Sequence, residues 1–262
     1  MRRGGGSGLS SQSLPRQRVG CGCGLAVLID IRTVAETVST NADMRTLARD
    51  GVGEGTWLRA ERQSGGRGRL GRDWESPAGN LYCSTIVRIR PGDPPPPTLA
   101  LVTAVAVHQA IDALVPGRTQ IKWPNDIMAG PAKLCGMLLE RTGDAIIIGI
   151  GVNVMAHPQI ADRPTTSLWA LGAVEGSAGT LIDSIALVFA DTLHVWRTYG
   201  LDPIRVRWLA AAHRPGTPLR VSLPDGEVLD GRFDDLSSGG ELILRLDNGA
   251  TRAIHAGDVF LV

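Results

Sequence analysis

Lysine is almost absent from this chain. Only Lys122 and Lys133 occur among the 27 basic residues, and every other cation is an arginine. A lysine ammonium is a compact point charge that the planar guanidinium of arginine does not replace. We therefore expect the two lysines, which lie close together in the sequence, to serve a specific chemical purpose; chance retention is the alternative.

Cysteines and net charge are also scarce. The four cysteines, Cys21, Cys23, Cys83 and Cys135, lack metal-ligand spacing, and the first two are too close together for a Cys-x-x-Cys motif. A reduced, cytoplasmic compartment is the simplest interpretation. The formal net charge of +1 gives no overall attraction to nucleic acid or to an anionic membrane, so any basic site must be local.

Long apolar runs are missing as well. No stretch approaches the roughly 18 residues of a membrane span, so we expect no association with a membrane. Residues 1–24 contain four arginines, many Gly and Ser residues and no acidic residue. The apolar residues that follow, 25–31, are too few for a secretory signal. We expect residues 1–24 to form a disordered tail.

The rest of the chain alternates between strand and helix patterns. Short aliphatic runs predict strands at 25–31, 55–61, 81–90, 119–123, 133–141 and 145–154. Helices are predicted from residue 40 to about Gly51, where Thr40 and Asp43 resemble a capping box, and at 98–115, 180–198 and 203–211. The run at 145–154 is apolar throughout, which is typical of a central strand buried on both faces. These patterns predict an α+β fold with a mixed sheet and flanking helices.

The C-terminal residues have a different pattern. Four short β-like runs, at 218–223, 228–236, 241–246 and 251–262, are separated by Asp-Gly, Gly-Gly and Asn-Gly turns. Such spacing predicts a small all-β module, which we expect to be a compact barrel. We therefore divide the chain into the tail at 1–24, a main domain at 25–212 and a β domain at 213–262.

The segment QSGGRGRLGRDW, residues 63–74, is the first candidate for chemistry. Gly66 and Gly68 allow the backbone to approach a ligand closely. Arg67 and Arg69 are two residues apart, so in an extended loop they point the same way, and convergent guanidiniums bind phosphate oxygens. A solvated hairpin and a patch for single-stranded nucleic acid are the alternatives.

Two further segments carry polar groups beside apolar strands. In IKWPNDIM, Asn125 and Asp126 follow Pro124, and an aspartate there could hold Mg²⁺ beside a triphosphate; simple turn chemistry is the alternative. In AKLCGMLLE, Lys133 stands at the start of a strand, where it could bind a carboxylate or a phosphate, or could simply face water.

Taken in order, these segments resemble biotin protein ligases. They read S-T-N at 39–41, Q-x-x-G-R-G-R-x-G-R-x-W at 63–74, K-W-P-N-D at 122–126, K-L-x-G-M-L-x-E at 133–140 and G-x-G-V-N-V at 149–154. The resemblance covers residues 28–262. It implies a class II synthetase-like biotin/lipoate ligase catalytic domain followed by an SH3-like β-barrel. Many bacterial members begin with a winged-helix DNA-binding domain, and this chain resembles the monofunctional kind that lacks one.

The family resemblance also implies the reaction. Biotin attacks the α-phosphate of ATP to give biotinoyl-5′-AMP, and a lysine of a biotin carboxyl carrier domain, as in acetyl-CoA carboxylase, then takes the biotinoyl group. ATP and biotin are thus expected as substrates, with Mg²⁺. The carrier protein is expected as partner without DNA or membrane, in the cytoplasm, and a homodimer is left open.

The same resemblance assigns candidate residues. The catalytic residues would be Lys133, Arg67 and Arg69, and the biotin site would comprise Ser39, Thr40, Asn41, Gln63, Gly66, Arg67, Arg69, Lys133 and Gly136. The ATP site would comprise Arg67, Arg69, Arg72, Trp74, Asn125, Lys133 and Asn153, and Asp126 would lie near Mg²⁺ or the incoming lysine. Cys135 departs from the family, which usually has a small residue such as Ala there.

Two rival functions remain open from the sequence. A lipoate ligase or lipoyl/octanoyl transferase of the same superfamily would bind an aliphatic tail, for which the polar residues Ser39, Thr40 and Gln63 are poorly suited. A nucleic-acid-binding module would use the arginine loop, residues 63–74, and the β domain. The net charge of +1 and the aromatic content of 4% argue against that module.

Overall fold

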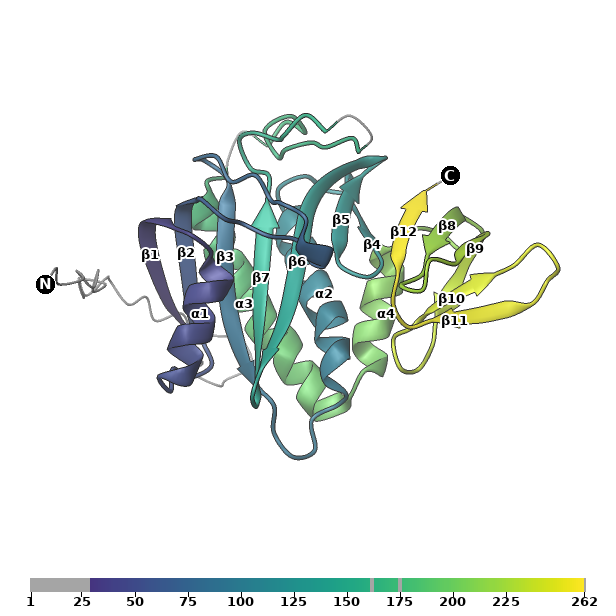
Figure 1. The fold of residues 1–262 in the computed structure, drawn as a ribbon, viewed down its shortest axis with the longest axis horizontal. Coiled ribbons are helices and arrows are strands. Elements are labelled where there is room, and N and C mark those ends of the chain that lie inside the picture. Colours follow the sequence, from purple (N-terminus) through teal and green to yellow (C-terminus); the bar gives the residue numbers. More distant parts are fainter. Residues whose placement is uncertain (1–28, 161–162, 174–175, 262) are drawn as a thin grey trace, which may run out of the picture.

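The computed structural model describes residues 29–160, 163–173 and 176–261. Within them, helices flank a large mixed sheet, and a smaller antiparallel sheet stands beside one end of it (Figure 1). The predicted α+β fold is confirmed. The predicted tail at 1–24 lies outside the described residues.

In the described residues the large sheet has seven strands in the order β1-β2-β3-β7-β6-β5-β4. Strands β1 and β2 pair in parallel and the other neighbours are antiparallel, so the sheet is mixed. Strand β7 is central, as its apolar sequence predicts. The strands are β1 (Asp30–Thr37), β2 (Thr56–Gln63), β3 (Leu81–Arg88), β4 (Gln120–Lys122), β5 (Asp126–Ala129), β6 (Ala132–Thr142) and β7 (Ala145–Val152).

Helices cover both faces of this sheet (Figure 1). Helix α1 (Thr40–Arg49) packs on one face through a small buried cluster that includes Met44, Leu58 and Ile147. Helices α2 (Leu99–Asp112), α3 (Ala178–Tyr199) and α4 (Asp202–Ala211) belong to a separate, larger core. Because β-strand side chains alternate between faces, the two clusters draw on alternate residues of the same strands.

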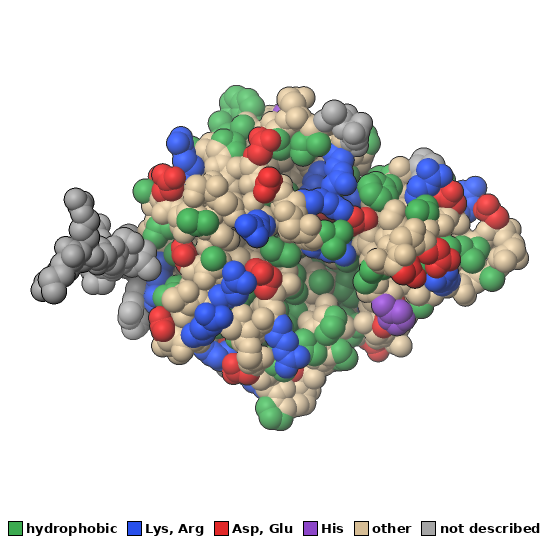
Figure 2. All heavy atoms as spheres, viewed as in Figure 1, with side chains coloured by type: hydrophobic (Ala, Val, Ile, Leu, Met, Phe, Trp, Pro, Cys, Tyr) green, Lys and Arg blue, Asp and Glu red, His purple; other side chains and the backbone are tan. Residues whose placement is uncertain are grey.

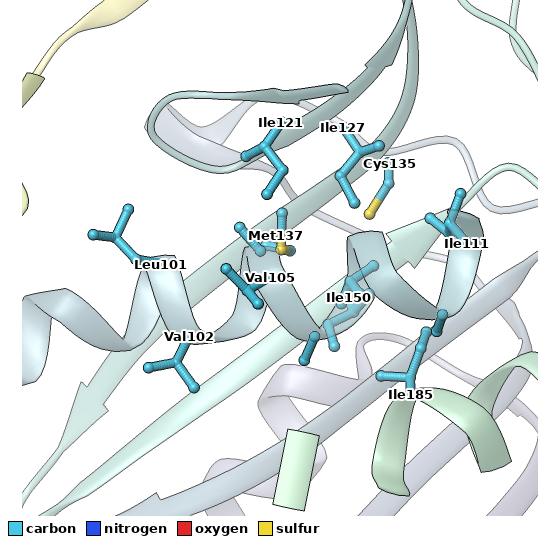
Figure 3. Close-up of a cluster of buried hydrophobic side chains, with 14 of the residues drawn as sticks. Leu101, Val102, Val105, Ile111, Ile121, Ile127, Cys135, Met137, Ile150 and Ile185 are labelled. Atoms are coloured by element: carbon cyan, nitrogen blue, oxygen red, sulfur yellow. The ribbon is translucent and has the colours of Figure 1, made fainter. Parts of the chain in front are cut away.

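Helix α2 is buried on nearly all sides because it lies between the sheet and the other helices. Figure 3 shows Val105 and Ile111 of α2 among Met137 and Ile150 of the sheet, with Ile185 of α3 beside them. All five side chains are at most 5% exposed. Burying an aliphatic side chain of this size contributes about 1.5–3 kcal/mol, so this layer holds the sheet and helices together.

Helix α3 is long and apolar enough to cross a membrane by length and composition alone. Its buried side chains include Leu181, Ile185 and Phe189, and it packs against α2 and β3 within the core. The ring of Phe189 meets Trp57 of β2 edge-on, with centroids 5.6 Å apart. These contacts identify α3 as a core helix of the folded domain.

The C-terminal residues form an antiparallel sheet in the order β11-β10-β9-β8-β12, with five strands in the described part of the chain. The strands are β8 (Pro218–Ser222), β9 (Val228–Leu236), β10 (Leu242–Arg245), β11 (Thr251–Ile254) and β12 (Asp258–Leu261). The last predicted run, 251–262, is thus two strands. Strand β12 returns to pair with β8 at the sheet's other edge, near the large sheet.

Two further strand predictions differ from the structure. Residues 126–129, predicted as part of a turn, form strand β5 between β4 and β6. The first strand was predicted at 25–31, but in the described residues it begins at Asp30 and ends at Thr37. Strand β1 is polar because its side chains are only partly buried at the edge of the sheet. Strand β5 has four residues and is too short to show a periodic pattern.

Candidate active site

One cavity of about 390 Å³ lies where the large sheet meets the C-terminal sheet. Figure 2 shows basic side chains gathered in the hollow between these two parts. The cavity brings together nearly all of the predicted site residues. They are Ser39, Thr40, Asn41, Gln63, Arg67, Arg69, Arg72, Trp74, Asn125, Asp126, Lys133, Gly136 and Asn153.

A neutral, polar group of side chains forms one end of the cavity. The backbone N–H of Thr40 donates to Gln63 Oε1 at 2.8 Å, and the Thr40 hydroxyl oxygen lies 3.2 Å from the same atom. Ser84 Oγ lies 2.8 Å from Thr40 Oγ1 and 2.7 Å from Asn41 Oδ1. Thr40, Asn41 and Ser84 are all buried, so this end is a rigid polar cage.

The start of α1 places Thr40 and Asn41 in this cage. Ser39 is the N-cap residue, with extended backbone angles. The predicted capping box of Thr40 and Asp43 is wrong: the Asp43 carboxylate accepts a hydrogen bond from Thr37 Oγ1 at 2.5 Å, and Thr40 Oγ1 is turned toward Gln63 instead. The hydroxyl that would have capped the helix is therefore part of the polar cage.

Lysines dominate the middle of the cavity. Lys133 Nζ lies 2.6 Å from Asp126 Oδ1, and Lys122 Nζ lies 3.3 Å from Asp126 Oδ2. Burial alone would raise the pKa of Asp126, but the two lysines outweigh it and hold the pKa below its ordinary value. Burial lowers the pKa of Lys122, which Asp126 only partly offsets. The two lysines of the chain thus share one carboxylate.

The arginine loop folds back on itself beside these lysines. Gly68 N–H donates to Arg72 O at 2.7 Å, and Trp74 N–H donates to Gly66 O at 2.9 Å. Gly66 lies behind the cavity wall, where a Cβ would stand 2.7 Å from Trp74 O. Leu70 takes a left-handed φ of 57° and is 78% exposed. A non-glycine residue in this conformation is strained.

The C-terminal sheet contributes to the loop's position. Arg69 donates to Asn125 Oδ1 at 3.3 Å and to Gly257 O at 3.2 Å. Arg72 forms an ion pair with Asp258 at the start of β12, and Arg69 Nη1 lies 3.9 Å from the same carboxylate. Lys122 Nζ also donates to Val259 O at 3.1 Å. Three cavity cations are therefore bound by one short segment, 257–259.

Trp74 covers the floor of the cavity. Its indole lies over Gly136 and Gly151, which face each other across β6 and β7; a Cβ on them would stand 3.0 Å and 2.7 Å from ring atoms. Lys133 Nζ lies 5.4 Å from the ring centroid. Among the described residues the buried indole N–H meets no acceptor. The glycines of both motifs thus make room for Trp74.

The two asparagines of the predicted nucleotide site are tied to the backbone. Asn125 Nδ2 donates to Met137 O at 2.5 Å, and Asn153 Nδ2 donates to Thr166 O at 3.0 Å. Each brings its segment against a neighbouring strand or loop. Trp123 is 6% exposed and its indole N–H donates to Gly240 O at 3.2 Å, so it packs between the two sheets.

The donor set does not fit a resident metal ion. The described residues contain no group of three or more His, Cys, Asp or Glu side chains that could hold one. Asp126 is the predicted ligand, and both of its oxygens face lysine ammonium groups. Mg²⁺ prefers several oxygen ligands in octahedral geometry and keeps water when proteins offer few. The residues present could at most assist an ion that arrives with a ligand.

Some lining residues were not predicted as part of the site. Arg163 and Asp258 line the cavity far from any motif in the sequence. Ser84 lies in the middle of strand β3, where a polar residue in an alternating strand pattern gives no sign of a functional site. Lys122 also lines the cavity; its rarity as a lysine was a signal, although no role followed from it. Residues such as Asp258 come from another sheet, and no local pattern marks them.

Known families match both parts of the chain. The family described as Biotin/lipoate A/B protein ligase family matches residues 39–153, and the one described as Biotin protein ligase C terminal domain matches residues 216–262. The biotin--[acetyl-CoA-carboxylase] ligase of Paracoccus denitrificans is 36% identical, covering 87% of this chain and 98% of that protein. The enzyme of the same name from Mycobacterium tuberculosis is 33% identical, covering 96% and 95%.

Solved structures show the same fold. The biotin protein ligase of Aquifex aeolicus, in complex with biotin and ATP, superposes with a TM-score of 0.80 at 23% identity, covering 88% of this chain and 99% of that chain. The biotin protein ligase of Leishmania major, in complex with biotinyl-5-AMP, gives a TM-score of 0.62 at 26% identity, covering 86% and 98%.

Proposed function

The chain belongs to the biotin protein ligase family, and on that premise we propose how its cavity works. The enzyme activates biotin with ATP as biotinoyl-5′-AMP and transfers the biotinoyl group to a lysine of a biotin carboxyl carrier domain. One observation supports this assignment for the cavity described above. A neutral polar cage and a cluster of cations line the same cavity.

The polar cage suits the ureido ring of biotin. Ser39, Thr40, Asn41 and Gln63 offer hydroxyl and amide groups there, and none of them is charged. A ureido group presents one carbonyl and two N–H groups, which need neutral partners in fixed positions. Lipoate has no such polar head, so the cage favours biotin over lipoate.

The cations suit the two anions that must react. The biotin carboxylate oxygen attacks the α-phosphorus, a new P–O bond forms, and the bond to pyrophosphate breaks. Charge gathers on the α-phosphoryl oxygens in the transition state, and preorganised cations stabilise it. We assign this to Lys133, Arg67 and Arg69. The backbone at Gly66 holds the loop close enough for its arginines to reach the site.

Other residues that line the same cavity are assigned to the nucleotide. We assign Arg72 to the phosphates and Trp74, Asn125 and Asn153 to the nucleoside side, with Gly136 leaving room above β6. The buried indole N–H of Trp74 is a donor that a ligand could satisfy. Mg²⁺ bound to the triphosphate would neutralise part of its charge, and Asp126 is the carboxylate that we assign to this region. The glycine-rich loop closes over the adenylate and excludes water.

Transfer follows when the carrier lysine attacks the carbonyl carbon of the mixed anhydride. The amine forms an amide bond, and AMP leaves with the electron pair of the broken C–O bond. We propose a cytoplasmic enzyme that acts on the carrier domain without DNA, with monomer or homodimer left to measurement. We also propose the division into a catalytic domain at 25–212 and a C-terminal domain at 213–262.

The direct test is ATP-dependent transfer of labelled biotin. The purified protein, a biotin carboxyl carrier domain and ATP should give a labelled carrier, and a carrier whose acceptor lysine is replaced by arginine should stay unlabelled. Biotin-dependent exchange of pyrophosphate into ATP should appear without the carrier. Exchange supported by lipoate and not by biotin would contradict the proposal.

A further inference from the structure

A row of hydrogen-bonding side chains runs from the protein surface to the polar cage. Glu140 Oε2 lies 2.7 Å from Asn41 Nδ2, and Ser84 Oγ lies 2.7 Å from Asn41 Oδ1. Ser84 Oγ also lies 2.8 Å from Thr40 Oγ1, which is 3.2 Å from Gln63 Oε1. Ser84 is fully buried, and Thr40 and Asn41 are at most 6% exposed. Buried polar atoms must find partners within such a row or in a ligand.

The carboxylate of Glu140 fixes the orientation of Asn41. An ionised carboxylate only accepts hydrogen bonds, so the atom that faces it must be the amide NH₂ of Asn41. The second N–H of this amide points toward Leu138 O at 3.4 Å. The amide lies in the space left by Gly149, which pairs with Ser84 in the sheet. Asn41 Oδ1 must therefore face Ser84.

The direction of the next hydrogen bonds follows. Asn41 Oδ1 can only accept, so the single hydroxyl hydrogen of Ser84 points to it. Ser84 Oγ then has only lone pairs for Thr40, and the Thr40 hydroxyl hydrogen must point back to Ser84. If Thr40 donated to Gln63 instead, two oxygens would stand 2.8 Å apart with no hydrogen between them.

Thr40 consequently turns only lone pairs toward the cavity. Gln63 Oε1 is an acceptor too, because it takes the backbone N–H of Thr40 at 2.8 Å. Two acceptors that lie 3.2 Å apart and have no hydrogen between them, because the Thr40 hydroxyl hydrogen points to Ser84, form a place for an N–H donor. The ureido ring of biotin has N–H groups to offer, whereas the dithiolane ring of lipoate has none.

We propose that Glu140, Asn41 and Ser84 form a polarity relay, which makes the Thr40 hydroxyl a hydrogen-bond acceptor for a ureido N–H. Glu140 and Ser84 are positioning residues in this relay, since they act on the ligand through Asn41 and Thr40. The inference rests on the proposed function and adds to it the element that sets the specificity of the polar cage.

The test compares biotin with cyclic carbamate analogues, in which either ureido N–H is replaced by a ring oxygen. The wild-type protein should bind biotin about tenfold more tightly than the analogue that lacks the N–H facing Thr40, which is the usual effect of one buried hydrogen bond. In Glu140→Gln the side-chain amide can accept from or donate to Asn41, and only the long 3.4 Å contact with Leu138 O still favours one direction, so Asn41, Ser84 and Thr40 can reverse their hydrogens. The preference should then fall several-fold, while the KM for ATP stays unchanged.

Arg45→Met is the matched control. Arg45 Nη1 pairs with Glu140 Oε1 at 3.3 Å, so this variant disturbs the same carboxylate without removing it and should keep the wild-type preference. Ser84→Ala removes the middle of the relay and should lose the preference as Glu140→Gln does. It also provides the test if Glu140→Gln does not fold.

Titration calorimetry separates the outcomes. Wild-type protein that binds no biotin contradicts the proposed function itself. Wild-type protein that binds biotin, with Glu140→Gln and Ser84→Ala retaining its preference, overturns the relay. Equal weakening of biotin and both analogues in these variants also overturns it, because the residues would then matter for packing alone.

Discussion

Lys133 holds a position that no other residue of the chain could take over. It lies 2.6 Å from Asp126, 5.4 Å from the Trp74 ring centroid, and against Gly136. Lys122, the other lysine, is bound to Asp126 and to Val259 O. An arginine at 133 would be larger, with a planar head that cannot enter the space between Trp74 and Asp126 unchanged.

We expect Lys133→Ala to slow biotin-dependent pyrophosphate exchange about 100- to 1000-fold, the usual effect of removing one preorganised donor to a developing charge. Lys133→Arg should restore little of the rate because the guanidinium does not fit the same space. Urea unfolding checks that both variants fold. Exchange within a factor of two of the wild-type rate would remove Lys133 from the catalytic assignment.

At the level of single residues, sequence and structure agree best where a motif is local. Lys133, Asn125 and the arginine loop were predicted because each lies in a compact, unusual segment, and the cavity brings them together. Their individual roles remain predictions. Ser84 and Asp258 were missed because a serine in a strand and an aspartate at the start of the last strand are ordinary until the fold places them beside Thr40 and Arg72.

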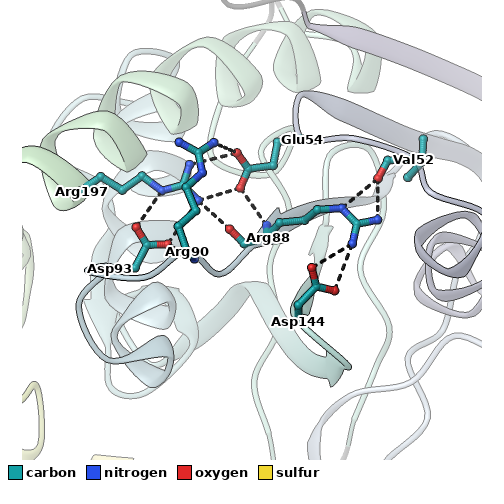
Figure 4. Close-up of polar contacts among 7 residues, drawn as sticks. All are labelled: Val52, Glu54, Arg88, Arg90, Asp93, Asp144 and Arg197. Atoms are coloured by element: carbon teal, nitrogen blue, oxygen red, sulfur yellow. Dashed lines mark hydrogen bonds and ion pairs between the residues drawn. The ribbon is translucent and has the colours of Figure 1, made fainter.

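Among the helices and strands, an ion-pair network joins the end of α3 to the start of β2, away from the cavity. Arg197 of α3 donates to both oxygens of Glu54, at 2.9 Å and 2.7 Å, and to Arg88 O at 2.9 Å (Figure 4). Glu54 also accepts the backbone N–H of Arg88 at 2.7 Å. Burial would raise the pKa of Glu54, but Arg197 and these bonds bring it below 4.5.

This lowered pKa predicts acid sensitivity. Because the folded-state pKa lies below the unfolded value, the stabilisation is complete above the unfolded pKa of 4.5 and disappears as the pH falls through the folded-state pKa. We expect Arg197→Met to reduce the free energy of unfolding by about 1–3 kcal/mol at pH 7, as for a hydrogen-bonded charged group. Its deficit should shrink at the lowest pH at which the protein stays folded.

Urea unfolding at several pH values measures the loss of unfolding free energy in Arg197→Met. The control is Arg252→Met, which removes an exposed ion pair with Glu227 in the C-terminal sheet and should leave the free energy of unfolding unchanged, since exposed pairs contribute little. A deficit for Arg197→Met that is constant from pH 7 down to acid unfolding would contradict the role given to Glu54.

The core layer makes a separate prediction about stability. Ile111 of α2 is fully buried among the sheet and helix side chains of Figure 3. Ile111→Ala should lower the free energy of unfolding by about 2–5 kcal/mol, because it leaves a cavity in a close-packed layer. Ala substitution of Val206, which is 65% exposed on α4, is the control. A loss below 0.5 kcal/mol for Ile111→Ala would show that this layer is loosely packed.

Helices and long strands were predictable because their apolar periodicity is strong. The helices at 98–115 and 180–198 and the central strand at 145–154 were found close to their observed bounds. Strand β5 was not predicted, because it is defined by its hydrogen bonds to β4 and β6, and a four-residue sequence does not indicate such pairing. The edge strand β1 is polar because its side chains are only partly buried at the edge of the sheet.

In the whole molecule, the C-terminal sheet lines part of the cavity. Arg72 pairs with Asp258, Arg69 donates to Gly257 O, and Lys122 donates to Val259 O. The sequence predicted a separate β domain but not this contact, because strands distant in the chain meet only after both sheets have formed. The arginine loop is therefore held in part by residues of the C-terminal sheet.

That anchorage predicts the behaviour of the loop. Asp258→Asn removes the carboxylate that pairs with Arg72 and faces Arg69, and the three close arginines then repel one another with one counter-ion fewer. Limited trypsin digestion, with the cleavage sites identified by mass spectrometry, should cut after Arg67, Arg69 or Arg72 several-fold faster than in the wild type. Biotin with ATP should restore protection, because the adenylate supplies the missing anion.

The control is Glu227→Gln, an exposed change in the same sheet, which trypsin should cut at the wild-type rate. Equal cleavage of Asp258→Asn and wild type, with or without ligands, would mean that the loop's own backbone hydrogen bonds hold it and the C-terminal sheet does not.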